Sequence, residues 1–238
     1  MKVKLSCSIN RFSLYIDLME SLTEENYLKA LLTLTGESRE VTVSALAKKL
    51  EIKMSTVTSM MKKLARKRLV SYRSYKPLKL TEKGRREALL IIRKHRLIEL
   101  FLVDKMSFRW DEVHDIAEQI EHVQAPHFFE RMDSMLGFPT IDPHGEAIPD
   151  KDGKLERASY HRLSSCKAGE AVTLRSVANA SAEFLKFLSS RQLHLGLRIR
   201  IESVEPVDGS VLIRYGKRHR ETLSHTICDR LLVEKDSI

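Results

Sequence analysis

The spacing of apolar residues changes once along the chain. Between residues 24 and 136 apolar side chains recur every three or four positions, the period of amphipathic helices. From residue 171 onward they alternate with polar residues, the period of half-buried strands. The pattern therefore predicts a mainly α protein with an appended small β-barrel of five strands. A turn-rich stretch, which contains Pro139, Pro143, Pro149 and Gly153, separates the two parts.

Residues 41–80 predict a winged helix-turn-helix. The expected elements are a helix over 41–50, a turn over 51–54, a helix over 56–67 with Ser55 as its N-cap, and wing strands over 69–73 and 78–80. Thr81 then begins another helix. In such a domain the second helix enters the major groove of double-stranded DNA.

The charge of the chain is concentrated in this same region. The formal net charge is +9, yet residues 43–86 hold 14 Lys and Arg against two acids, a local excess of +12 that leaves −3 for the rest. Such a basic segment is typical of a module that binds a polyanion. An anionic membrane surface is the competing partner, but the segment shows neither a broad apolar helix face nor a lipidation motif. We therefore expect DNA, and no membrane, as the partner.

Two groups of residues are expected to contact that DNA. Side chains near the start of the second helix can reach base edges, and basic side chains beyond them can reach phosphates, which makes binding salt-dependent. The first group is Lys53, Ser55, Thr56, Thr58 and Ser59; the second is Lys62, Lys63, Arg66, Arg73 and Lys76. The alternative is an ordinary solvated helix face.

Histidine and glutamate are grouped at helical spacing in the next region. His114, Glu118, Glu121 and His122 share one side of a predicted helix that has Asp111 as its N-cap, and His95 with Glu99 repeats the pattern upstream. Nitrogen and carboxylate donors without a thiolate suit Mn(II), Fe(II), Co(II) or Zn(II). The alternative is a pair of solvated faces on which these side chains only support each other.

The helix that begins near Arg85 carries too many apolar residues for one stripe. A helix that is apolar on several sides needs two partners, such as its own domain and a second subunit, so we expect a homodimer. The three cysteines, Cys7, Cys166 and Cys228, are far apart and show no ligand or disulfide spacing, which fits the reducing cytoplasm.

These patterns divide the chain into five expected segments. They are an N-terminal tail over 1–22, a winged helix-turn-helix domain over 23–88, a metal-binding and dimerisation domain over 89–140, a linker over 141–162 and a small β domain over 163–236. We expect a cytosolic tail and not a signal peptide, because Asn10, Arg11 and Asp17 interrupt its apolar region, and Met19 is an alternative start.

Several short motifs resemble the diphtheria-toxin-repressor family of metal-dependent transcriptional regulators. They are Glu24–Leu28, Ser55–Thr58, Leu80–Gly84, Arg93–Leu97, Val113–His114, Ile120–Val123 and the Pro-His-Gly stretch within Asp142–Pro149. The resemblance covers residues 22–150 and, more weakly, a C-terminal SH3-like (FeoA-like) domain. It implies a homodimer that binds operator DNA of metal-uptake genes and represses them when a divalent metal is bound.

The resemblance also implies which residues hold the metal. Glu118, Glu121 and His122 match the regulatory site, and His95, Glu99 and His114 match an ancillary site, to which Glu183 of the C-terminal domain is a further candidate. Glu118 stands where iron-type members have Cys and manganese-type members have Glu, which favours Mn(II), with Fe(II) second. Asn26 stands where relatives offer Met or Asp as a ligand from the N-terminal helix, and Arg68 stands where they usually have Gly.

Two other functions remain as alternatives. A metallohydrolase also uses His and Glu, but the chain has no His-Glu-x-x-His motif and no nucleophile beside a base. A metal-independent winged-helix regulator would keep the His/Glu cluster only for structure, and its DNA binding would be insensitive to chelators.

Overall fold

The computed structural model describes residues 22–36, 40–156 and 158–236. The chain forms two compact units: the first is Met1–His95 with Glu121–Gln124 and Pro149–Leu155, and the second is Arg96–Ile120, Ala125–Ile148 and Glu156–Ile238. The predicted N-terminal tail up to residue 21, with the alternative start at Met19 and Cys7, lies outside the described residues.

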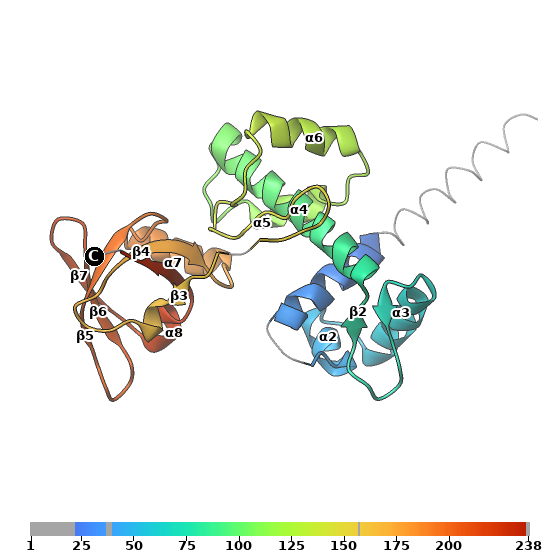
Figure 1. Cartoon of the computed structure of the whole chain (residues 1–238), viewed down its shortest axis with the longest axis horizontal. Helices are drawn as coiled ribbons and strands as arrows, with labels where there is room; N and C mark the ends of the chain where they lie inside the picture. The colour runs from blue at the N-terminus through green and yellow to red at the C-terminus, as the bar shows by residue number, and fades with distance from the viewer. Residues whose placement is uncertain (1–21, 37–39, 157, 237–238) are drawn as a thin grey trace, which may run out of the picture. The chain divides into compact units, whose positions relative to one another are not determined.

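The first unit is a winged helix-turn-helix. A helix over residues 22–36 is followed by α2 (Val43–Lys49), α3 (Met54–Arg66), β1 (Val70–Ser71), β2 (Lys79–Leu80) and the start of α4 (Glu82–Met106), several of which are labelled in Figure 1. The strands are antiparallel, with Val70 opposite Leu80, and are shorter than predicted. Leu31, Leu46, Val57, Met61 and Leu64 are fully buried and form the centre of its core.

Side-chain caps account for the starts of α2 and α4 in this unit. The Thr42 side chain accepts a hydrogen bond from Ala45 N at 3.1 Å, and the Thr81 hydroxyl accepts one from Gly84 N at 3.0 Å. The predicted N-cap at Ser55 is wrong, because α3 begins at Met54. The carbonyl of Lys53 already accepts the first helical bond from Val57 N, at 3.2 Å.

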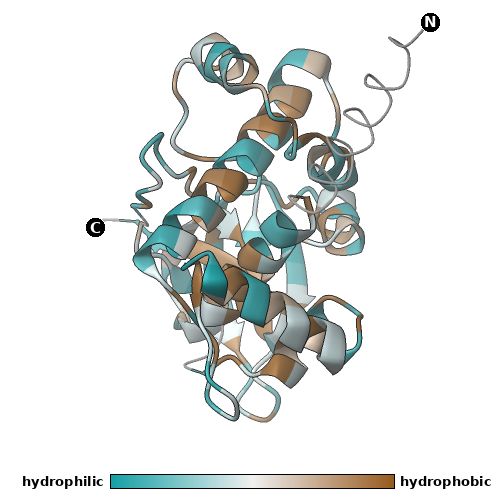
Figure 2. Cartoon of the chain, turned by 90° about the vertical axis from the view of Figure 1, so that its right-hand side faces the viewer, coloured by the Kyte–Doolittle hydropathy of each residue, from teal (hydrophilic) through white to brown (hydrophobic). Residues whose placement is uncertain are grey.

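The second unit contains the remainder of α4, α5 (His114–Ile120) and α6 (Pro126–Met135), which pack around Leu97, Ile98 and Phe129. Figure 2 shows brown and teal segments alternating along individual helices, as expected for amphipathic helices. The predicted N-cap at Asp111 is wrong. Its buried carboxylate pairs with Arg109, at 2.6 Å, and α5 begins three residues later.

The C-terminal part of this unit is an antiparallel sheet with α7 (Ala182–Ser190) and α8 (His225–Cys228). The strands are β3 (His161–Arg162), β4 (Ala171–Val177), β5 (Arg198–Val204), β6 (Val211–Tyr215), β7 (His219–Leu223) and β8 (Leu231–Lys235). Their order is β3-β8-β4-β5-β6-β7. The prediction of a five-stranded barrel is therefore corrected to an open six-stranded sheet, because in the described chain the edge strands β3 and β7 do not pair with each other.

Residues 141–148, which lie in the predicted linker, are a packed part of the second unit. Asp142, His144 and Ile148 are buried, and the carbonyl of His144 accepts a hydrogen bond from Val177 N of β4 at 3.0 Å. A Cβ on Gly145 would lie 2.0 Å from the carbonyl oxygen of Arg175, so only glycine permits this approach. The Pro-His-Gly stretch is therefore a packed structural element.

Gly84 offers a test of the wing's packing. A Cβ at this position in α4 would lie 1.9 Å from the carbonyl oxygen of Leu69, which belongs to the backbone and cannot rotate away. Gly84→Ala should lower the free energy of unfolding of the first unit by roughly 3 kcal/mol.

Urea denaturation followed by circular dichroism measures this loss. Gly36→Ala is the matched control, because a Cβ at Gly36 meets nothing within 4 Å. Equal stability of the two variants would contradict the close approach of α4 to the wing.

Candidate metal centre

The carboxylate of Glu121 is the centre of a buried cluster in the first unit. Helix α5 ends at Ile120, so Glu121 and His122 lie in the turn that follows and not on the helix itself. The side chain of Glu121 is 1% exposed. His95 Nδ1 of α4 lies 2.6 Å from its Oε2, and His122 Nε2 lies 3.5 Å from its Oε1.

The helix over residues 22–36 supplies two further members of this cluster. Lys29 Nζ donates to both oxygens of Glu121, at 2.8 and 3.0 Å. Glu25 Oε2 lies 2.8 Å from His122 Nδ1, which directs the other ring nitrogen toward Glu121. A carboxylate on one nitrogen of a histidine is the usual arrangement around a metal-binding imidazole, because it fixes the ring's tautomer and orientation.

The environment keeps Glu121 ionised. Burial alone would raise its pKa, but the hydrogen bond with His95 and the charge of Lys29 outweigh burial and hold the pKa below its ordinary value. A buried carboxylate that stays anionic beside two imidazoles is a suitable ligand set for a borderline or hard divalent ion. His95, Glu121 and His122 thus fit a metal, with Glu25 as the partner that orients His122.

A second cluster lies in the second unit around Glu99. One ligand atom each of Glu99, Asp142 and His144 lies within 4.8 Å of the others. His144 Nδ1 is 3.6 Å from Glu99 Oε2, and His114 Nδ1 is 3.3 Å from Glu99 Oε1. Together these residues form a second group of oxygen and nitrogen donors.

Burial and charge shift the proton equilibria of this second cluster. Burial lowers the pKa of His144, but its hydrogen bond and charge interaction with Glu99 outweigh burial and raise the pKa to about 9. Burial raises the pKa of Asp142 to about 6, although the neighbouring Arg96 opposes this. A proton held on His144 offsets the charge of Glu99, and a divalent ion would take the place of that positive charge.

The predicted ligands divide into those that the structure brings together and those that it does not. His95, Glu121 and His122 meet in the first unit, and Glu99 and His114 meet in the second. The remaining three lie on the surface. Glu118 is about half exposed and 3.8 Å from His114, Asn26 is exposed, and Glu183 is exposed in the first turn of α7.

Sequence reasoning missed four residues of these clusters: Glu25, Lys29, Asp142 and His144. Glu25 and Lys29 stand at an i, i+4 spacing, which places them on one helix face, and Asn26 is turned about 100° away. That spacing could have identified them. No spacing could have identified Asp142 and His144, which reach Glu99 through the fold of residues 141–148.

The predicted DNA-contacting residues lie along α3 and the wing. Lys53, Ser55, Thr56, Ser59, Lys62, Arg66, Arg73 and Lys76 are exposed, and Thr58 is half-buried. Lys63 differs, because its ammonium lies 3.1 Å from the carboxylate of Glu24, which also pairs with Lys67 at 2.7 Å. Glu24 therefore links the helix over residues 22–36 to α3.

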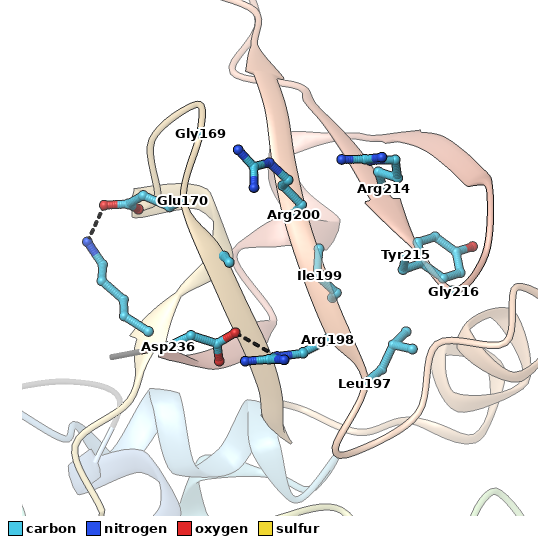
Figure 3. A pocket seen from close by; sticks show the side chains of 12 residues that line it. Gly169, Glu170, Leu197, Arg198, Ile199, Arg200, Arg214, Tyr215, Gly216 and Asp236 are labelled. Atoms are coloured by element: carbon cyan, nitrogen blue, oxygen red, sulfur yellow. Dashed lines mark hydrogen bonds and ion pairs between the residues drawn. The ribbon is translucent and has the colours of Figure 1, made fainter. Parts of the chain in front are cut away.

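A hollow of about 880 Å³ lies on the C-terminal sheet, bordered by Arg198, Arg200 and Arg214 (Figure 3). Most of its charges are paired within the protein: Arg198 with Asp236 at 2.9 Å, and Lys235 with Glu170 at 2.6 Å. This pairing weakens the attraction of the hollow for anions, and we assign it no site.

Models of three families match successive parts of the chain. Residues 17–78 match the N-terminal DNA-binding domain of iron-dependent repressors, residues 81–150 match their metal-binding and dimerisation domain, and residues 161–235 match the FeoA domain. Of the described helices, none is long and apolar enough to cross a membrane.

Individual relatives agree with these matches. The iron-dependent repressor IdeR of Mycobacterium leprae is 29% identical over 225 residues, which are 90% of this chain and 97% of that protein. A manganese-dependent transcriptional repressor solved with manganese is 32% identical, with a TM-score of 0.82 over 89% of this chain and 99% of its own. The structure of ScaR with bound Zn²⁺ is 31% identical, with a TM-score of 0.75 over 90% and 99%.

These relatives are repressors and not enzymes, so the metallohydrolase alternative falls. The domain order, the winged helix and the buried His/Glu cluster all agree with the predicted resemblance. The chain belongs to the diphtheria-toxin-repressor family of metal-dependent transcriptional repressors, whose members bind DNA and dimerise.

Proposed function

We propose that the protein is a cytoplasmic Mn(II)-responsive repressor that binds operator DNA of metal-uptake genes as a homodimer, with Fe(II) as the second candidate metal. The observation that supports this most is the cluster of His95, Glu121 and His122, in which every donor is nitrogen or oxygen. Such donors suit Mn(II) better than softer ions, which prefer thiolates. Relatives include a manganese-dependent repressor, an iron-dependent repressor and ScaR solved with bound Zn²⁺.

The cluster is connected to the DNA-binding helix through a short route. Glu25 and Lys29 of the helix over residues 22–36 contact the cluster, while Glu24 of the same helix pairs with Lys63 and Lys67 at the end of α3. A metal held by residues of α4 and the turn after α5 would therefore act on a helix that touches α3. Metal binding that favours one position of that helix would then change operator affinity.

A dimer is proposed for the helices of the second unit. Phe128 and Met135 of α6 and the neighbouring Phe138 are 45%, 53% and 68% exposed, which is unusual for large apolar side chains in one segment. A second copy of the chain would cover them and would place two winged helices on successive half-sites of the duplex.

A metal-independent regulator is the second candidate function. The ion pair between Lys29 and Glu121 already connects the helix over residues 22–36 to the cluster, and this favours an arrangement that needs no metal. Operator affinity that is equal in Mn(II) and in a chelator would support this candidate over the first.

The metal site is tested by Glu121→Gln and His122→Ala. Glu121→Gln removes the negative charge and one of the two carboxylate oxygens, and His122→Ala removes the imidazole, so Mn(II)-dependent operator affinity should fall at least a hundredfold, with the dimer still folded. The measurement is fluorescence anisotropy on a duplex that the wild-type protein selects from a random pool in the presence of Mn(II).

His127→Ala is the matched control for these variants, because the side chain of His127 is 98% exposed and pairs with Glu130 of its own helix at 2.9 Å. Its affinity should equal that of the wild type. Variants of Glu121 and His122 that still respond fully to Mn(II) would contradict the proposed site.

Phosphate contacts are tested by the salt dependence of operator binding. Lys62→Ala and Arg66→Ala each remove one exposed cation from α3 of both subunits of the proposed dimer, so each should lower the slope of log affinity against log salt by about 1.8, which is about 0.9 per phosphate contact. Lys186→Ala removes an exposed cation from α7 and should leave the slope unchanged. An unchanged slope in all three variants would place the DNA elsewhere.

A further inference from the structure

Lys29 occupies a position that matters for metal affinity. Its ammonium donates to both oxygens of Glu121, at 2.8 and 3.0 Å, and lies 3.4 Å from His95 Nδ1. These are atoms of the carboxylate and imidazole that would hold the metal. A cation contributed by the chain itself therefore binds to the same two side chains as the proposed ligand.

We propose that Lys29 is an internal competitor of the metal, which sets the metal concentration at which the cluster fills. This inference rests on the proposed function of the cluster as a metal site. In the metal-free protein Lys29 neutralises Glu121, and a divalent ion takes over the carboxylate by displacing the ammonium.

Electrostatics makes the two cations mutually exclusive at this carboxylate. The side chain of Glu121 is 1% exposed and that of His95 is 9% exposed, so solvent screens little of the repulsion between neighbouring positive charges there. An ammonium within 3 Å of the carboxylate and a divalent ion on the same oxygens would repel each other strongly. The net free energy of metal binding therefore includes the cost of moving the Lys29 ammonium away from Glu121.

The side chain of Lys29 has a route for this withdrawal. It is 19% exposed and sits on a flexible four-carbon stem, so the ammonium can move to solvent without unfolding its helix. Glu25, one turn earlier on the same face, stays hydrogen-bonded to His122. The helix thus exchanges one contact with the cluster and keeps the other.

The exchange has a further effect on the helix over residues 22–36. Before metal binds, Lys29 connects this helix directly to Glu121. Afterward that direct ion pair is lost, and Glu25 connects the helix to the metal through His122. Lys29 therefore tunes the affinity of the cluster for the metal and is not a ligand.

The test compares Mn(II) affinity of the full chain before and after removal of the ammonium. Lys29→Met keeps the length of the side chain and removes its charge, and Lys29→Arg keeps the charge. Mn(II) alone is titrated into chelator-stripped protein, and the free ion is measured by electron paramagnetic resonance. Loss of a charge-assisted hydrogen bond that competes with the metal should tighten Mn(II) binding in Lys29→Met by on the order of ten- to a hundredfold.

The matched control is Lys67→Met, which removes a cation paired with Glu24 of the same helix outside the cluster. Its Mn(II) affinity and that of Lys29→Arg should stay close to the wild-type value. Unchanged or weaker affinity in Lys29→Met would overturn the proposal.

A second readout covers the case in which Lys29→Met folds less stably. Saturating Mn(II) should raise its melting temperature by more than it raises that of the wild type, because stabilisation by a ligand grows with affinity for the folded state. An equal rise in both proteins would overturn the competition.

The outcomes also separate this inference from the proposed function. Wild-type operator binding that responds to Mn(II), together with an unchanged affinity in Lys29→Met, would reject only the role of Lys29. Tighter Mn(II) binding in Lys29→Met, together with operator binding that ignores Mn(II), would support that role and reject the repressor mechanism.

Discussion

A buried negative charge needs a positive partner, and in this protein that constraint is concentrated at Glu121. The carboxylate is almost entirely shielded from water, and an unpaired charge there would be costly. Residues from three places in the chain neutralise or surround it: Lys29 from the first helix, His95 from α4 and His122 from the adjacent position in the turn. The charge balance inside the first unit thus depends on the ammonium of Lys29 and the imidazole of His95 at this carboxylate.

The second cluster satisfies a similar constraint in a different way. Glu99 lies near His144, whose raised pKa of about 9 keeps a proton on the ring at neutral pH. His144 Nε2 also lies 2.8 Å from the carbonyl oxygen of Trp110, and the indole nitrogen of Trp110 donates to Ser189 of α7 at 2.8 Å. Within the second unit, the Glu99 cluster is therefore continuous with the helix of the C-terminal domain.

Much of the fold could be predicted from periodicity. The predicted change of period at residue 171 coincides with the start of β4, and the limits of α2 and α3 agree with the two predicted helices to within two residues. The open sheet and the packed 141–148 segment could not be predicted. Strand pairing and the reach of His144 toward Glu99 depend on contacts between distant residues, which no local spacing encodes.

The candidate site could be predicted only in part, because local spacing does not show where a helix ends or which distant residues it meets. Glu121 and His122 lie in the helical His/Glu pattern, His95 lies in its own pair with Glu99, and all three match family motifs, whereas the end of α5 at Ile120 changes which neighbours Glu121 has. Glu118 stays on α5 and faces His114 at the surface. The prediction places His114, Glu118, Glu121 and His122 together because it assumes a continuous helix through residue 122. In the structure the helix ends at Ile120, and a turn carries Glu121 and His122.

Glu24 and Glu25 are consecutive residues of one helix, and this adjacency has a mechanical consequence. One faces the lysines at the end of α3, the other faces His122, and their Cα atoms are separated by a rise of only about 1.5 Å along the helix axis. With no loop or hinge between the two contacts, a sliding or rolling of the helix that relaxes one must strain the other. The helix over residues 22–36 therefore moves as one rigid body, and its contacts with α3 and with His122 change together.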